Sequence, residues 1–313
     1  MQASDELTYR KGIIFTAGSY LLWGVLPLYW KKIDNVSSGE ILAHRIIWSF
    51  IFMLILLSIQ KEWGNIVEIS KKLFSQPLVL LSLVLSSLLI SINWFVYIWS
   101  VNHHHILETS LGYYINPLIS VLLGMIFLKE KLNLWQKISM GLAFIGVLII
   151  TLQYGEIPWL ALILAGSFGL YGLTKKMTKF NSVIGLTFET LVVTPIAFTY
   201  VSILASGGES VFFEFDTQTN LLLIGAGVAT AIPLLLFASG AKRIPLFLVG
   251  IIQYISPTIT LIIGIFLYHE PFTQIEMITF TFIWSAILLF SFSNSKLFKR
   301  AEVKLIRKNS IGL

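Results

Sequence analysis

The segment SLGYYINPLISVLLGMIFLKE, residues 110–130, decides the fold of this chain. It is an apolar, helix-length run that is interrupted in the middle by Asn116-Pro117, and a related segment, GIIQYISPTITLIIGIFLYHE, occupies residues 250–270. The two copies share a tyrosine, a proline, a glycine and a glutamate at matching positions: Tyr114, Pro117, Gly124 and Glu130 return as Tyr254, Pro257, Gly264 and Glu270. An internal repeat of this kind indicates a chain built from two related halves.

The composition places the chain in a membrane. Of its 313 residues, 56% are hydrophobic and 12% are charged, with a mean hydropathy of +0.82, whereas soluble domains carry about 25% charged residues. No soluble domain is left between the apolar runs, and neither nucleotide-binding nor hydrolase motifs occur. With no cysteine, disulfides and thiolate metal sites are excluded. The sequence therefore predicts an all-α membrane protein that is not an enzyme and has no cofactor.

Ten apolar runs are each close to the roughly 20 residues that cross a hydrocarbon core as a helix. They predict ten transmembrane helices at residues 12–31, 39–60, 77–100, 106–128, 134–153, 157–174, 182–205, 218–240, 245–267 and 273–292. Arg10-Lys11 precedes the first run, which lacks a small-residue cleavage site and so favours an uncleaved span. The connection at 61–76 mixes apolar and charged residues, and it is either a helix on the membrane surface or a polar loop.

Charge sets the predicted orientation. With the N-terminus in the cytoplasm, the inner loops carry all of the 22 Lys and Arg residues except Lys31, Lys32 and Arg45. This matches the positive-inside rule, so the net charge of +6 is a topology signal and not a nucleic-acid surface. Five helices per half invert the second half relative to the first. We expect a cytoplasmic N-terminus (1–11), two inverted five-helix repeats (12–153 and 157–292) and a basic cytoplasmic tail (293–313).

Inverted repeats place a substrate site between the halves, near the middle of the membrane. Pro117 and Pro257 occupy matching places in the two halves and are the predicted hinge residues, with a tolerated kink as the alternative. Asn116 and Gln253 are amides within spans, where burial without partners costs about 4 kcal/mol. They either line a pocket or bind neighbouring helices.

Aromatic and polar side chains on the first and third spans extend this predicted site. Asn93 and Tyr97 are four residues apart and share one helix face. Trp23 lies in the middle of the first span and either walls a cavity or packs in the bundle core. Trp30, beside two lysines, is typical of the interfacial belt.

Ionisable groups within spans mark pathways or partners by default. Arg45 either anchors the interface or faces the cavity, where it grips an anionic group or pairs with an acid. Glu189 is the one carboxylate well inside a span, and it either pairs with Arg45 or titrates during transport. With His44, it is the candidate for proton coupling. The consecutive residues His103, His104 and His105 point about 100° apart on a helix and predict no metal site. Glu130 and Glu270 are expected to cap or brace neighbouring helices.

Four stretches together resemble the RarD group of EamA-type transporters in the drug/metabolite transporter superfamily: GSYLLWGVLPLYWK from Gly18, EILAHRIIWS from Glu40, NWFVYIWSVN from Asn93 and SLGYYINPL from Ser110. The resemblance covers about residues 10–295. It implies two inverted five-helix repeats, a bacterial inner-membrane location and a permease, often labelled a chloramphenicol-sensitivity or resistance protein. It also implies functional roles for His44, Arg45, Asn93, Asn102, Tyr113 and Asn116.

We therefore expect a secondary transporter or permease that moves a small polar or amphipathic metabolite or drug, amino-acid-like or amphenicol-like, by alternating access. Its predicted partners are this substrate and the lipid bilayer, without nucleic acid, and no oligomeric state is predicted. The alternatives are a membrane receptor or signalling protein without transport, or a channel. The expected substrate-binding residues are Trp23, His44, Arg45, Asn93, Tyr97, Asn102, Tyr113, Asn116, Gln253 and Tyr254.

Overall fold

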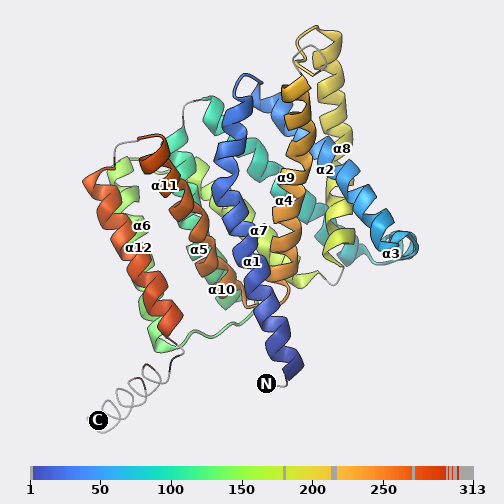
Figure 1. Cartoon of the computed structure of the whole chain (residues 1–313). Coiled ribbons are helices and arrows are strands. Elements are labelled where there is room, and N and C mark those ends of the chain that lie inside the picture. The colour runs from blue at the N-terminus through green and yellow to red at the C-terminus, as the bar shows by residue number, and fades with distance from the viewer. Residues whose placement is uncertain are drawn as a thin grey trace.

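The computed structural model describes residues 3–103, 105–178, 181–212, 217–269 and 272–293, together with residues 295, 298 and 302. The regular elements in this part of the chain are all helical (Figure 1). In chain order they are α1 (Ala3–Trp30), η1 (Lys31–Ile33), α2 (Ser38–Gln60), α3 (Trp63–Ser75), α4 (Pro77–Asn102), α5 (Ile106–Phe127), α6 (Leu134–Tyr154), α7 (Trp159–Met177), α8 (Ser182–Ser206), α9 (Thr217–Ala241), α10 (Leu246–Gln253), α11 (Ile255–Leu267) and α12 (Gln274–Phe292).

Nine segments in the described ranges are long and apolar enough to cross a membrane. They are α1, α2, α4, α5, α6, α8, α9, α12 and the combined segment Leu246–Leu267, which contains α10 and α11. The span expected at 157–174 forms the helix α7, which is not among the nine. Its last turn carries Lys175 and Lys176, and these charges lower its hydropathy.

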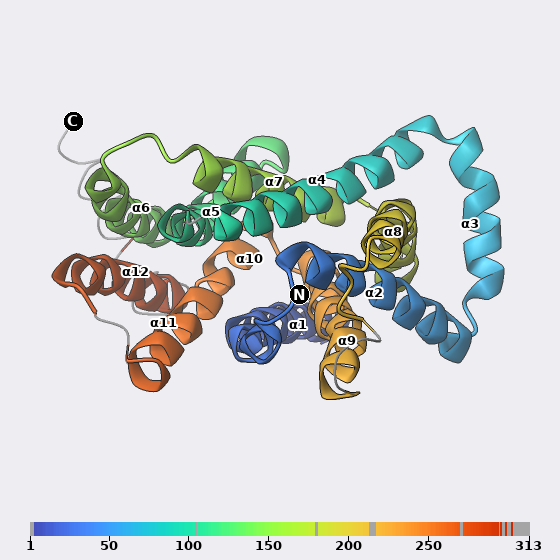
Figure 2. The same ribbon diagram turned by 90° about the horizontal axis from the view of Figure 1, so that it is seen from above.

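The start of α1 and the end of α12 lie at the same end of the bundle (Figure 1). The connection between α2 and α4 is helical, which decides between the two interpretations of residues 61–76 in favour of a helix. This helix, α3, lies across the bundle axis and joins the ends of α2 and α4 (Figure 2). Its residues Ile66 and Ile69 pack against the core, so the apolar face of α3 is turned to the bundle.

The helices of the two predicted halves interdigitate around several buried apolar clusters, the largest of which contains residues of α1, α2, α4, α5, α7, α8, α9 and α10. α1 packs against α9 and α11, α2 against α8 and α9, α4 against α7 and α8, α5 against α7 and α10, and α6 against α12. The largest fully buried side chains include Tyr20 of α1, Tyr171 of α7 and Phe237 of α9. Because these contacts join helices from different halves, neither half forms a separate bundle.

The two copies of the repeated segment differ in their backbone. The second copy breaks at Tyr254, where α10 ends and α11 begins. Pro257 has no N–H to donate to the carbonyl of Gln253, four residues earlier, but Pro117 lacks the same donor, so the proline alone does not account for the break. The first copy forms α5, which continues through Pro117. A Cβ atom on Gly250 would lie 2.7 Å from the carbonyl oxygen of Pro117, so only glycine permits this approach of α10 to α5.

Candidate functional site

Arg45 points from α2 into a group of aromatic side chains. Its Nε atom donates a hydrogen bond to Oγ1 of Thr230 on α9 (2.9 Å). Its guanidinium lies 4.7 Å from the ring centre of Trp30 and 5.5 Å from that of Trp94. Aromatic rings at these distances stabilise a desolvated cation. Among the described residues, no carboxylate forms an ion pair with Arg45.

Two tyrosines complete the surroundings of this cation. Tyr97 of α4 and Tyr113 of α5 lie near enough to the guanidinium for electrostatic interaction. Their rings are 6.1 Å apart in an edge-to-face arrangement, and Tyr113 keeps 46% of its surface accessible. The structure thus brings together three predicted site residues, Arg45, Tyr97 and Tyr113. We call the whole group the arginine cluster: Trp30, Arg45, Trp94, Tyr97, Tyr113 and Thr230.

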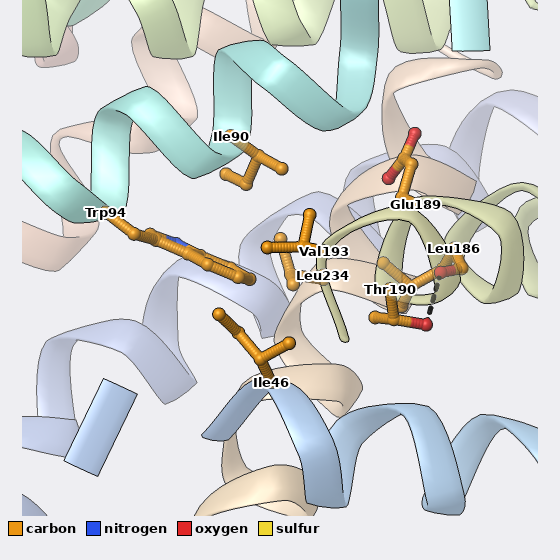
Figure 3. A pocket seen from close by; sticks show the side chains of 8 residues that line it. All are labelled: Ile46, Ile90, Trp94, Leu186, Glu189, Thr190, Val193 and Leu234. Atoms are coloured by element: carbon orange, nitrogen blue, oxygen red, sulfur yellow. Dashed lines mark hydrogen bonds between the residues drawn. The ribbon is translucent and has the colours of Figure 1, made fainter. Parts of the chain in front are cut away.

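A small cavity, with room for about one water molecule, lies next to this cluster between α2, α4, α8 and α9 (Figure 3). Trp94 borders it on one side and Glu189 on the other. The hydroxyl of Thr190 donates to the carbonyl of Leu186 (2.9 Å), so it is already satisfied within its own helix. The remaining lining is apolar, from Ile46, Ile90, Leu186, Val193 and Leu234. The same indole ring, that of Trp94, therefore contacts both this cavity and Arg45.

Glu189 pairs with Lys175 and not with Arg45. Its Oε1 atom accepts from Nζ of Lys175 (2.5 Å) and from the hydroxyl of Ser86 (2.5 Å). Its Oε2 atom accepts from the hydroxyl of Tyr171 (3.2 Å). Sequence reasoning placed Lys175 in a basic inner loop, whereas it is buried in the last turn of α7. The signal that could have found it is Glu189 itself, because a carboxylate deep in a span needs a cation.

His44 faces a loop at the end of the bundle rather than the arginine cluster. Its ring centre lies 4.5 Å from that of Phe212, and its Nδ1 atom accepts from Nε1 of Trp48 (3.2 Å), which places the ring proton on Nε2. Glu40 binds the same loop, since its Oε1 atom accepts from Ser210 Oγ (2.8 Å) and from the backbone N–H of residue 211 (2.8 Å). In the described residues, His44 Nε2 and Glu40 Oε2 are buried without hydrogen-bond partners.

The predicted amide and tyrosine ligands mostly bind neighbouring helices. Asn93 donates from Nδ2 to the carbonyl of Leu164 (2.9 Å) and to Ser167 Oγ (3.0 Å), joining α4 to α7. Gln253 accepts from the hydroxyl of Tyr20 (3.2 Å), joining α10 to α1. Asn116 accepts from Ser120 (3.3 Å) within α5 itself. Tyr254, between α10 and α11, donates to the carbonyl of Tyr114 on α5 (3.3 Å). In this conformation Asn93, Gln253 and Tyr254 therefore join neighbouring helices, whereas Asn116 binds within its own helix.

The remaining predictions fall in three groups. Trp23 packs against Tyr20 and Phe237 at ring distances of 5.4 and 5.8 Å, which places it in the bundle core. Glu130 accepts from the backbone N–H groups of Leu246 (2.7 Å) and Phe247 (3.0 Å), which confirms that it caps a neighbouring helix, α10. His104, Glu270 and the side chain of Asn102 lie outside the described residues.

Three members of the arginine cluster, Trp30, Trp94 and Thr230, were missed from the sequence. Thr230 gave no signal, because most threonines in membrane helices bond back to their own helix. Trp30 was assigned to the interfacial belt from its flanking lysines, and its contact with Arg45 depends on the tertiary packing of α1 against the bundle.

Comparison with known proteins relates the chain to transporters. Residues 10–152 match the EamA-like transporter family. The chain is 56% identical to the uncharacterized transporter YojE of Bacillus subtilis (strain 168), covering 94% of this chain and 97% of that protein. It is 41% identical to the protein RarD of Escherichia coli (strain K12), covering 91% and 95%. A solved crystal structure matches with a TM-score of 0.69 at 14% identity, covering 92% of this chain and 99% of that one, a likeness that concerns the fold alone.

Proposed function

Because the chain belongs to the EamA-like transporter family, as a RarD-type permease of the bacterial inner membrane, we propose that it is a secondary transporter that works by alternating access. As a membrane transporter of the drug/metabolite superfamily, it would move a small polar or amphipathic molecule, amino-acid-like or amphenicol-like. The observation that carries this proposal is the arginine cluster, where side chains from α1, α2, α4, α5 and α9 meet around one cation. We place the substrate against this cluster.

The helix packing supports ten spans arranged as two inverted repeats, with α7 as the sixth span and α10–α11 as the ninth. In the two repeats α1 corresponds to α7, α2 to α8, α4 to α9, α5 to α10–α11 and α6 to α12. If corresponding helices are exchanged, the contact between α1 and α9 becomes the contact between α7 and α4. In the same way, the contact between α5 and α7 becomes the contact between α11 and α1. The pairs α2–α8, α5–α10 and α6–α12 exchange into themselves. A pseudo-twofold axis in the membrane plane produces this pattern.

Local structure repeats with the same spacing. Tyr114 and Tyr254, which occupy matching places in the two copies, touch each other across the interface of α5 and α10. Lys129 and His269 both have a left-handed backbone, with φ of 54° and 55°. The capping boxes at the starts of α6 and α12 also occupy matching positions, at Asn133–Gln136 and Thr273–Glu276. These matches support domain boundaries at 12–153 and 157–292.

Polar contacts join the halves at the end of the bundle where α1 begins. Ser86 of the first half donates to Glu189 of the second, and Glu130 of the first half caps α10 of the second. Nearby, Nζ of Lys176 in the second half lies 4.0 Å from Oε1 of Glu130 in the first. We assign this end to the cytoplasm from the basic loops, and we propose that these contacts form the closed inner gate.

Purified protein in liposomes tests the proposed function. Counterflow should accumulate a labelled substrate when the vesicles are preloaded with the unlabelled compound, because one site is exposed alternately to the two sides. The panel should cover amino acids, amphenicols and carboxylates, with protein-free vesicles as the control. Flux that does not saturate and shows no counterflow would identify a channel. No flux for any compound would favour a receptor.

Proton coupling is a separate part of the proposal, and Glu189 and His44 are its candidates. Both are buried, and each lies beside an ionisable group of opposite type that a proton would affect: the ammonium group of Lys175 for Glu189 and the carboxylate of Glu40 for His44. Transport should lose its dependence on a pH gradient in Glu189→Gln or in His44→Asn. If both variants keep that dependence, neither residue carries the coupling proton.

A further inference from the structure

We propose that the arginine cluster selects organic monoanions, namely small carboxylates that carry a flat apolar group, over zwitterions and neutral compounds. This inference rests on the proposed transport function and, among small amphipathic molecules, favours carboxylates over amino-acid-like zwitterions and neutral amphenicols. The observation behind it is that Arg45 enters the interior of a membrane protein with its charge uncompensated by any carboxylate among the described residues. A cation within a membrane marks a ligand or a partner.

The nearby acids are all bound to other groups. On its own helix, Glu40 accepts from the loop at Ser210 and lies 3.9 Å from His44. On α8, Glu189 is held by Lys175 at 2.5 Å. The titratable groups that α4 and α5 turn to Arg45 are the tyrosines at 97 and 113, which are neutral hydroxyl groups. The arginine cluster therefore carries a net positive charge, which an anion would neutralise.

The hydrogen bonding of Arg45 leaves one edge of its guanidinium group free to bind this anion. Its Nε atom is taken by Thr230, and its two Nη atoms form no hydrogen bond with the described residues. Carboxylates accept two parallel hydrogen bonds from a guanidinium, and the two Nη atoms provide such a pair.

The aromatic side chains around Arg45 favour a flat apolar group in the rest of the ligand. Trp30 and Trp94 lie on the guanidinium, and Tyr97 packs edge-to-face on Tyr113, so flat apolar surfaces surround the cation. A planar apolar group packs favourably against such rings. An amino acid would add an ammonium group, which needs an acceptor and would be repelled by Arg45. The same side chain without the ammonium should therefore bind more tightly.

Three probes with the same ring and different charges test this selectivity. Binding of phenylacetate, phenylacetamide and phenylalanine to the purified protein is measured by calorimetry in detergent. Phenylacetate should bind about tenfold or more tightly than the other two, because only it can accept two charge-assisted bonds without adding a cation. Equal affinity for the acid and its amide, or no binding of phenylacetate, would overturn the inference. This comparison uses the wild-type protein and needs no variant.

Variants assign the selectivity to Arg45. Arg45→Lys should weaken phenylacetate binding about tenfold, because lysine keeps the positive charge but lacks the two parallel N–H donors of the guanidinium. Arg45→Gln should abolish binding, because it removes the charge as well. Arg243→Gln is the matched control, since Arg243 is an exposed cation that also lies over an aromatic ring, that of Phe15 at 5.3 Å. Unchanged binding in Arg45→Gln would overturn the assignment.

The outcome separates this inference from the proposed function. Preferential binding of phenylacetate without counterflow would leave the anion site standing and contradict the transport mechanism. Counterflow of amino acids or amphenicols without a preference for the anion would leave transport standing and contradict the site.

Discussion

Lys175 and Glu189 face each other inside the bundle with Nζ and Oε1 2.5 Å apart, and their side chains are only 3% and 4% exposed. The lysine comes from the last turn of α7 and the glutamate from the second turn of α8. Hydroxyl groups of Ser86 and Tyr171 also donate to the carboxylate. Both charges are therefore balanced, in contrast to Arg45, and the pair ties α4, α7 and α8 together.

Breaking this pair should destabilise the protein more than removing it. Glu189→Gln or Lys175→Met alone should lower the free energy of unfolding by about 3 kcal/mol, because each leaves one buried charge without its partner. The double variant should cost less than the sum of the two. Unfolding in mixed micelles measures all three, with Lys131→Met as an exposed control. Strictly additive costs would contradict a direct interaction.

Lys242, directly after α9, should make stability depend on pH. Partial burial, together with the positive charges of Lys175 and Arg243 and against the opposing effect of Glu189, lowers the pKa of Lys242 to about 8 from 10.5. Between these two values the unfolded chain binds more protons than the folded one, so stability should rise as the pH rises from about 8 to 10.5. Thermal unfolding across this range should show the rise, and Lys242→Met should flatten it. An identical profile in this variant would contradict the assignment.

Glu130 should stabilise α10 through its cap. Its carboxylate accepts from two backbone N–H groups at the start of α10, those of Leu246 and Phe247. Glu130→Gln should lower the free energy of unfolding by about 1–2 kcal/mol, because an uncharged amide is a weaker acceptor at a helix N-terminus. Glu156→Gln, at an exposed position before α7, is the control and should have little effect. Equal melting temperatures for both variants would show that the cap contributes nothing.

Gly227 should be essential for the packing of α9 against α2. A Cβ atom at this position would collide with backbone atoms of Trp48 and Ser49, which cannot move aside without shifting α2. Gly227→Ala should cost about 1–3 kcal/mol of stability. Because α2 carries Arg45 and α9 carries Thr230, it should also weaken binding at the arginine cluster. Gly141→Ala, where nothing lies within 4 Å of the added atom, should be neutral or slightly stabilising. Equal stabilities would contradict this account.

Much of the helical architecture was predictable from the sequence, because the constraints of a membrane act along the chain. Apolar runs of membrane-spanning length and the repeated proline–glutamate skeleton gave the positions of the helices and the cap of Glu130. The candidate site was only partly predictable. Arg45, Tyr97 and Tyr113 were predicted as site residues and do lie together.

The sequence could not predict which helix faces contact each other. Periodicity shows that Asn93 and Gln253 need partners, but it does not show whether the partner is a substrate or the next helix. In this structure the partners are Leu164 and Ser167 for Asn93, and Tyr20 for Gln253. Lys175 was assigned to a loop because its neighbours in the sequence are basic, and only the approach of α8 to α7 buries it.

The break at Tyr254 has a mechanical consequence. The two copies of the repeated segment differ in continuity, since the second copy is divided at Tyr254 into two short helices, α10 and α11, whereas the first copy forms one long helix, α5. A jointed element bends locally, whereas a straight one pivots as a whole. We therefore expect any bending between conformations to fall at Tyr254, in the second copy of the repeated segment, rather than within α5.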